Sequence, residues 1–253
     1  TEPISLEANT FDVNCHGQND GQIDLIVNGG TGPYDFQWNT GENSSSLNGI
    51  SAGTYLCEIV DGNNCMASIN VEINEPSELL MLTVEGHDLM CNGDSSGEIN
   101  SFVQGGTPPY SYEWSTGQTT ASINQLAPGS YALTVTDDKN CNAYSGALIN
   151  EPEALQVISE TSDVLCFGES NGSVVISVSG GTQPYEYSWG DQDNTLLNNP
   201  SETLYGISAG DYLIRVMDKN GCLNEQVFMI AEPDLFESEI NLKSFFLSSL
   251  KLL

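Results

Sequence analysis

The chain has 253 residues, and its 35 acidic against 5 basic side chains give a formal net charge of −30 at pH 7. This excess of negative charge argues against nucleic acid and anionic membrane surfaces as partners, because binding to either requires basic patches. The apolar fraction of 39% suits a folded chain, and we expect no membrane span in this segment, since no apolar stretch is long enough.

One block of about 75 residues occurs three times, which predicts a tandem array of similar structural units. The landmarks that recur are a glycine pair, a tryptophan and a cysteine: Gly29-Gly30, Gly105-Gly106 and Gly180-Gly181; Trp38, Trp114 and Trp189; Cys15, Cys91 and Cys166. We place the repeats at residues 1–76, 77–152 and 153–233, followed by an incomplete or aberrant segment at 234–253.

After the first cysteine of each repeat, apolar and polar residues alternate, as at 23–27, which is typical of a half-buried strand. After a Gly-Gly-Thr turn and a proline comes a second alternating stretch, 34–38, with aromatic residues on one face. Three aromatic residues on one strand face could form a ligand platform, but they are more often the core of a sandwich. The sequence therefore favours a core role for Tyr34, Phe36 and Trp38.

A glycine and then a tyrosine open the next strand, as in Gly53-Thr54-Tyr55, a pattern that resembles the tyrosine corner of Greek-key sandwiches. This strand ends at an aspartate followed by hairpin residues, and the second cysteine of the repeat opens the last strand. Evidence for helices is almost nil. We therefore predict an all-β fold, a tandem array of three small Ig-like antiparallel β-sandwich modules with one disulfide each.

Six of the seven cysteines form matched pairs, one pair in each repeat: Cys15 with Cys65, Cys91 with Cys141, and Cys166 with Cys222. Small modules bury a modest core, and a repeated cysteine pair in them indicates a disulfide framework formed in an oxidising compartment. Zinc would need short ligand spacings such as Cys-x-x-Cys, and none occurs. We expect the remaining cysteine, Cys57, to be a buried free thiol.

Two acidic positions also recur, and they are the candidate metal ligands: Asp61, Asp137 and Asp218 at the strand end, and Glu75, Glu151 and Glu232 in the closing Glu-Pro. Calcium is the cofactor that such oxygen ligands would suit, at a joint between modules. The sequence favours a simpler interpretation, in which each aspartate caps its own turn and each glutamate is solvated. No His, Ser or Cys group recurs as a nucleophilic site would, so we predict no catalytic residues and no enzyme.

Taken together, these landmarks resemble the SprB repeat. The pattern runs Cys-x-Gly, Gly-Gly-Thr-x-Pro-Tyr, an aromatic residue two before Trp, Gly-x-Tyr, an Asp-led turn ending in Cys, and Glu-Pro, and it covers residues 11–233. That family occurs in very large cell-surface proteins of gliding and related Bacteroidota. The resemblance implies export to the cell surface and a role in adhesion or gliding motility, without catalytic residues or an established ligand site.

We therefore expect a non-enzymatic segment of a secreted, extracellular surface adhesin. Its modules would act as a stalk or spacer, or as multivalent adhesive units, with neighbouring repeats of the same long chain as partners. The alternative is a carbohydrate-binding module array, calcium-dependent, attached to a secreted enzyme and directed to surface polysaccharide. Burial of the aromatic residues at 34–38 would weaken this alternative and leave a lengthened loop at 190–200 as the distinctive surface.

Overall fold

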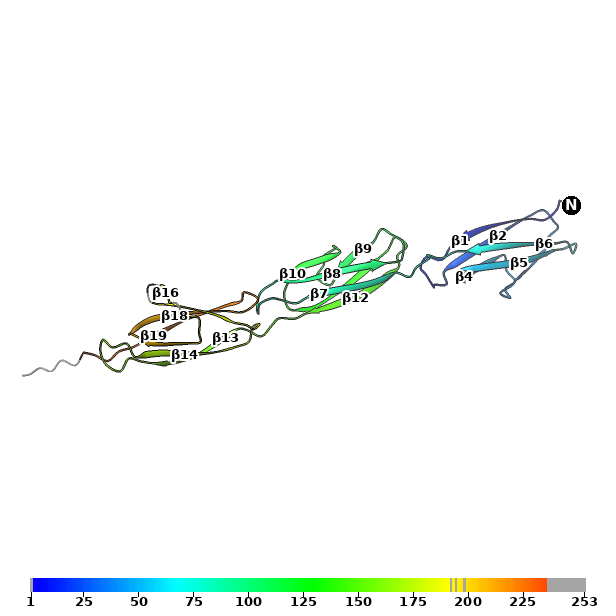
Figure 1. The fold of residues 1–253 in the computed structure, drawn as a ribbon. Coiled ribbons are helices and arrows are strands. Elements are labelled where there is room, and N and C mark those ends of the chain that lie inside the picture. The colour runs from blue at the N-terminus through cyan, green and yellow to red at the C-terminus, as the bar shows by residue number, and fades with distance from the viewer. Residues whose placement is uncertain (1, 192, 194, 198, 236–253) are drawn as a thin grey trace, which may run out of the picture. The chain divides into compact units, whose positions relative to one another are not determined.

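The structure is a computed structural model, and it describes residues 2–191, 193, 195–197 and 199–235 (Figure 1). The regular secondary structure in this part of the chain consists of β-strands alone, and all strand pairs are antiparallel. The chain forms two compact units. One holds the residues up to Leu89 together with Ser95–Asn150, and the other holds Met90–Asp94 together with the residues from Glu151 onward.

The first unit contains two β-sandwiches, each built from two three-stranded sheets. The first sandwich has the sheet orders β1-β2-β4 and β3-β5-β6, with strands β1 (Ser5–Phe11), β2 (Gly21–Asn28), β3 (Tyr34–Trp38), β4 (Ser46–Ile50), β5 (Gly53–Asp61) and β6 (Met66–Ile73). The second has the orders β10-β8-β7 and β12-β11-β9, with strands β7 (Met81–His87), β8 (Gly97–Gln104), β9 (Ser111–Trp114), β10 (Ser122–Leu126), β11 (Gly129–Thr136) and β12 (Asn142–Ile149).

The second unit contains the third sandwich, whose second sheet has four strands. Its sheet orders are β13-β14-β17 and β16-β15-β18-β19, with strands β13 (Gln156–Ser162), β14 (Gly172–Ser179), β15 (Glu186–Gly190), β16 (Leu196–Leu197), β17 (Thr203–Ile207), β18 (Gly210–Met217) and β19 (Leu223–Ile230). The extra strand β16 lies in the residues inserted in the third repeat. The predicted array of three Ig-like antiparallel β-sandwiches is thus confirmed.

The core of each sandwich lies between its two sheets, as the alternation of apolar residues predicts. In the first sandwich Ile23 of β2, Trp38 of β3 and Ile59 of β5 are almost fully buried in one cluster. Tyr34 and Phe36 pack against this cluster and are half-buried. The aromatic strand face is therefore part of the core, as the sequence favours, and the tryptophan fills its centre.

Hydrogen bonds of the aromatic side chains fix the sandwich corners. The Trp38 indole Nε1 donates to the carbonyl oxygen of Ser44 at 2.8 Å, so its one polar group is satisfied inside the core. The Tyr55 hydroxyl donates to the carbonyl oxygen of Ser51 at 2.7 Å, four residues upstream. The same tyrosine bond recurs at Tyr131 with Ala127 and at Tyr212 with Ser208. This is the tyrosine corner predicted from the sequence.

The path of the chain places the two cysteines of a repeat at opposite ends of the sandwich. Cys15 lies in the loop between β1 and β2, beside the end of β6, where the Val13 N–H donates to the Asn74 carbonyl oxygen at 2.9 Å. Cys65 lies in the turn between β5 and β6, at the start of β6. The eight residues of β6 separate these two places by about 25 Å, at about 3.3 Å per residue.

Two short segments at these ends recur in all three sandwiches, and they are named here for later use. The first-cysteine loops are residues 14–18, 90–94 and 165–169, which contain Cys15, Cys91 and Cys166. The second-cysteine turns are residues 61–65, 137–141 and 218–222, which end at Cys65, Cys141 and Cys222.

In each sandwich a glycine pair follows the second strand. It allows the backbone there to lie against the residues that precede the first strand. Gly105 has a φ of +67°, and a Cβ atom there would lie 2.1 Å from the carbonyl oxygen of Leu79. Gly117 also has a positive φ, of +83°, but a Cβ atom there would meet open space. The two positions therefore share a backbone conformation and differ in steric room.

We expect Gly105→Ala to destabilise the protein more than Gly117→Ala. Both substitutions incur about 1–2 kcal/mol for an alanine in the left-handed region, and only Gly105→Ala adds a collision worth about 1–3 kcal/mol. Urea unfolding of the full chain, followed by tryptophan fluorescence, measures the difference. Equal midpoints for the two variants would contradict the close backbone approach at Gly105.

Candidate functional site

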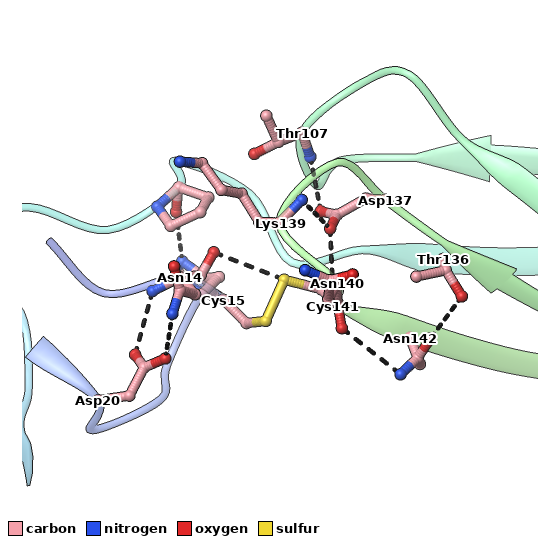
Figure 2. Close-up of a disulfide and its surroundings, with 12 residues drawn as sticks. Asn14, Cys15, Asp20, Thr107, Thr136, Asp137, Lys139, Asn140, Cys141 and Asn142 are labelled. Atoms are coloured by element: carbon pink, nitrogen blue, oxygen red, sulfur yellow. Dashed lines mark hydrogen bonds between the residues drawn. A yellow bond between two sulfur atoms is a disulfide. The ribbon is translucent and has the colours of Figure 1, made fainter.

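Two disulfides join successive sandwiches of the array, and they are the most distinctive chemical feature of the chain. Cys15 is bonded to Cys141 with a Cα–Cα distance of 5.7 Å, and Cys91 to Cys222 with a Cα–Cα distance of 5.5 Å. Each bond lies inside one of the two compact units. Each connects a first-cysteine loop to the second-cysteine turn of the following repeat. Figure 2 shows the first of them, between Cys15 and Cys141.

This arrangement contradicts the pairing expected from the sequence, which placed one bridge inside each repeat, as Cys15–Cys65, Cys91–Cys141 and Cys166–Cys222. The physical reason is distance. The two cysteines of one repeat lie at opposite ends of β6, β12 or β19, about 25 Å apart, whereas a disulfide requires Cα atoms within about 7 Å. Cys65 and Cys166 are instead free and exposed.

The sequence did not reveal this because strand count alone does not give strand direction. β3 pairs antiparallel with β5, and β4 pairs antiparallel with β2. β2 and β5 run in the same direction, so their antiparallel partners β4 and β3 also share one direction. β3 and β4 lie in different sheets, and together they bring the chain back across the sandwich once. The chain between Cys15 and Cys65 therefore makes three net crossings, which end at the far side of the sandwich.

A buried aspartate shapes each second-cysteine turn. Asp61 is 5% exposed, and its Oδ1 accepts hydrogen bonds from the N–H groups of Asn63 at 2.9 Å and Cys65 at 2.8 Å. Its Oδ2 accepts from the Thr31 N–H at 3.0 Å. Asp137 and Asp218 make the same three kinds of bond in their own repeats. Each aspartate thus fixes the position of the cysteine backbone and ties it to the Gly-Gly-Thr turn.

These hydrogen bonds stabilise the ionised carboxylates. The Cys65 N–H, together with those of Thr31 and Asn63, lowers the pKa of Asp61 against the opposing effect of burial. Burial acts to raise the pKa of Asp218, but the N–H donors of Thr182 and Cys222 outweigh it, so this pKa is lowered. The favoured interpretation of the sequence, in which each aspartate caps its own turn, agrees with these contacts.

A glutamate holds each first-cysteine loop at the opposite end. Glu75 Oε2 accepts a hydrogen bond from the Gly17 N–H. The equivalent bonds, Gly93 to Glu151 and Gly168 to Glu232, are both 2.8 Å long. The closing Glu-Pro of each repeat is therefore bonded to the loop that carries the first cysteine, rather than merely solvated. On the other side of Cys15, both the backbone N–H and the side-chain amide of Asn14 donate to Asp20 (Figure 2).

The six candidate metal ligands thus divide between two ends of each sandwich, and every one of them accepts a backbone N–H. Asp61 and Glu75 of one repeat do not meet. Within the described part of the chain, no group of three His, Cys, Asp or Glu side chains is placed to hold a metal ion. Calcium binding stays a prediction that these contacts do not test.

The remaining candidate residues are packed or hydrogen-bonded within the sandwiches. Cys57 is a free thiol on β5 with no exposed area, and burial raises its pKa, which disfavours the reactive thiolate. In the third sandwich, Tyr187 donates to Glu202 at 2.8 Å, and burial together with this bond raises its pKa to about 12. The lengthened loop at 190–200 is described only in part, and the expected aberrant segment at 234–253 lies outside the described residues beyond Leu235.

Peptide mapping without reduction tests the disulfide assignment. We expect linked peptides that contain Cys15 with Cys141 and Cys91 with Cys222. Cys65 and Cys166 should react with an alkylating reagent in the folded protein, and Cys57 only after unfolding, because its thiol is buried. A linked peptide joining Cys15 to Cys65 would show that the bridges form within repeats and would overturn the assignment.

Substitution of Asp61 tests the role of the turn carboxylate. We expect Asp61→Asn to lower the free energy of unfolding by about 1–3 kcal/mol, because the amide replaces one acceptor with a donor that faces a backbone N–H. Asp35→Asn, which removes the same charge from an exposed position on β3, is the control and should have little effect.

The pH dependence gives a second readout for the same pair. The pKa of Asp61 is lowered in the folded state, so its stabilisation is present above the unfolded value of about 3.9 and is lost as pH falls through the folded pKa. Below about pH 4 the difference between the wild-type chain and Asp61→Asn should shrink. A constant difference from pH 7 to pH 3 would show that the carboxylate charge does not matter.

Comparison with solved structures gives only distant similarity. The Down syndrome cell adhesion molecule with eight N-terminal Ig domains aligns over 84% of this chain and 34% of its own length, with 14% identity and a TM-score of 0.39. The ectodomain of mouse nectin-like molecule 4 aligns over 79% of this chain and 82% of its own, with 14% identity and a TM-score of 0.36. The chain thus spans about a third of the first structure. Similarity at this level carries no inference about function.

Comparison with curated proteins gives no match. In the described residues, no helix has the length and apolar character needed to cross a membrane. The SprB repeat family model, by contrast, matches three stretches of the chain, residues 8–43, 84–119 and 158–194. Each match begins in the first strand of a sandwich and includes the first cysteine, the Gly-Gly turn and the tryptophan. The resemblance found in the sequence is therefore confirmed by a match to the SprB repeat model at three places along the chain.

Proposed function

We propose that this chain is a non-enzymatic spacer segment of an extracellular surface adhesin, in which disulfides between successive repeats limit how far the segment can extend under load. The observation that carries the proposal is that both bridges cross from one repeat to the next. A bridge inside a module would protect that module alone. A bridge between modules makes the joint itself covalent.

The two bridges also overlap along the chain, and this shortens the covalent route between the ends. The loop closed by Cys15–Cys141 contains Cys91, and the loop closed by Cys91–Cys222 contains Cys141. The shortest covalent route for a load that enters before Cys15 and leaves after Cys222 crosses to Cys141, runs back along the chain to Cys91 and crosses to Cys222, so it includes less than half of the intervening residues. Such a segment stays short even when its sandwiches unfold.

Two further features support an extracellular location and a structural role. Disulfides persist in oxidising compartments such as the bacterial cell exterior and are rare in the cytosol. The SprB repeat family model matches the chain at three places. Because resemblance to this family implies surface adhesion and gliding motility, we include both processes in the proposal. The high negative charge suits a segment that must stay soluble and avoid collapse onto its neighbours.

The alternative of a carbohydrate-binding array draws less support from the contacts. Its aromatic platform would need Tyr34, Phe36 and Trp38 at the surface, but Trp38 is buried and the other two pack against the core. The same holds for Tyr110, Tyr112 and Trp114 in the second sandwich. Since these side chains already stabilise the sandwiches, they are poor candidates for stacking on a sugar ring.

Single-molecule stretching of the full chain between its two ends tests the spacer proposal. We expect the oxidised chain to reach less than half the final contour length of the reduced chain, at about 3.5 Å per residue released. The control is the double variant Cys141→Ser with Cys222→Ser, which should reach the length of the reduced chain without reductant. Equal final lengths with and without reductant, in a wild-type chain whose bridges are verified, would overturn the proposal.

A further inference from the structure

The joint between the first and second sandwiches contains two adjoining cavities, of about 570 and about 360 Å³, and both lie within one compact unit of the chain. The larger cavity is called the joint groove below. The two cavities share four lining residues, three from the first repeat and one from the second: Asn14, Asp20, Pro76 and Lys139. Small ligands bind preferentially in pockets of this size between domains, so the chemistry of the joint groove decides what it suits.

An exposed aromatic ring lines the joint groove. Phe11, the last residue of β1, is 59% exposed. The aromatic side chains at 34–38 differ from it, because they pack in or against the core of the same sandwich. A phenyl ring that a ligand covers removes a large apolar area from water. Phe11 therefore offers the apolar contact that the aromatic strand does not.

The ammonium group of Lys139 supplies hydrogen-bond donors at the same place. In a chain with 35 acidic side chains, Lys139 Nζ makes no ion pair or hydrogen bond with any residue that the structure describes. Its backbone is fixed, since the Lys139 N–H donates to Asp137 Oδ1 at 2.9 Å. Figure 2 shows the side chain extending from the second-cysteine turn across the joint toward the first repeat. Its three donors are thus available to a ligand in the groove.

Two carboxylates of the first repeat supply acceptors. Asp12 Oδ1 accepts the Asn74 N–H at 2.9 Å. The two oxygens of Asp20 accept the backbone N–H and the side-chain amide of Asn14 at 3.0 and 2.7 Å. These bonds hold both carboxylates in place, and they leave acceptor positions open, because an ionised carboxylate has about four. The joint groove therefore combines acceptors and donors with an apolar ring.

The groups that give the joint groove its chemistry do not recur in the other repeats, although the joint itself does. The corresponding residues of the second and third repeats, or of the first and third, are different: His87 and Ser162 for Phe11, Ser96 and Asn171 for Asp20, and Asn63 and Asn220 for Lys139. Contacts that hold a joint together should recur with the joint, as the cysteines and the turn aspartates do. The ring, the carboxylate and the ammonium therefore serve something other than the joint.

We propose that the joint groove binds a neutral saccharide. Sugar hydroxyls both donate and accept, so they match the carboxylates of Asp12 and Asp20 and the ammonium of Lys139, while the apolar face of the sugar ring covers Phe11. The carboxylates repel acidic sugars. The proposal goes beyond the spacer role, because it assigns a ligand to one joint. It also differs from an array of carbohydrate-binding modules, whose aromatic platform would have to recur in every repeat.

Titration of the full, oxidised chain with saccharides tests the proposal. The probes are short neutral oligosaccharides of glucose, galactose and mannose, followed by isothermal titration calorimetry. We expect at least one of them to bind with one site per chain, and a uronic acid oligosaccharide of equal length not to bind. A chelator should have no effect, since no metal-binding group of side chains occurs in the part of the chain that the structure describes. Failure of every neutral probe to bind would overturn the proposal.

Variants of exposed side chains locate the ligand. Phe11→Ser and Lys139→Met should each raise the Kd about tenfold, which is typical of truncating a side chain that a ligand covers. Phe102→Ser removes another exposed aromatic ring of the same compact unit, and Lys219→Met removes another lysine, so both are matched controls and should leave the Kd unchanged. Equal affinity of the wild-type chain and Phe11→Ser would show that the ligand binds elsewhere.

Opening the bridge at the joint gives an independent readout. The joint groove takes residues from two repeats that Cys15–Cys141 connects, so Cys141→Ser should weaken binding about tenfold. Cys222→Ser opens the other bridge and should leave binding unchanged. Full affinity in Cys141→Ser would place the ligand on one sandwich alone and overturn the proposal. The stretching experiment uses no saccharide, so failure of the ligand site and failure of the spacer role can be told apart.

Discussion

The bridge between the first-cysteine loop of one repeat and the second-cysteine turn of the next is the interaction on which the organisation of this chain depends. Small sandwiches of this size bury limited cores, and stability has to come from elsewhere as well. Cys15–Cys141 and Cys91–Cys222 span sequence separations of 126 and 131 residues. In the chain-entropy model a loop of this length is worth about 5 kcal/mol, although overlapping loops share part of that stabilisation.

The bridge works because both of its ends are held in place before the sulfur atoms meet. At the second-cysteine turn, one buried carboxylate accepts three backbone N–H groups, including that of the cysteine itself. At the first-cysteine loop, the glutamate of the closing Glu-Pro holds the glycine two residues after the cysteine. The repeated acidic residues are therefore explained by backbone hydrogen bonds at the joints, and their recurrence does not by itself indicate a metal.

The recurring aromatic residues, like the acidic ones, are explained by structural contacts. A tryptophan, a tyrosine corner and the aromatic strand beside them recur in every repeat, which in a sequence could suggest a ligand platform. In the structure the tryptophans fill the cores, and each indole N–H is bonded to a carbonyl oxygen within the same sandwich. By contrast, the free thiols of Cys65 and Cys166, which lie at the ends of their sandwiches, are exposed at the surface.

The sequence by itself determined the repeat, the strand type and the core. The 75-residue period showed three modules, alternation of period two showed strands, and the spacing of glycine and tyrosine showed the corner, because each of these signals depends on local geometry. It also located the turn carboxylates such as Asp61. Only the tertiary structure decided which cysteines meet. The spacing of Cys15 and Cys65 is equally compatible with a bridge inside the repeat and one between repeats. The choice depends on β3 and β4 running in the same direction, and that follows from sheet pairing between distant strands rather than from any local pattern.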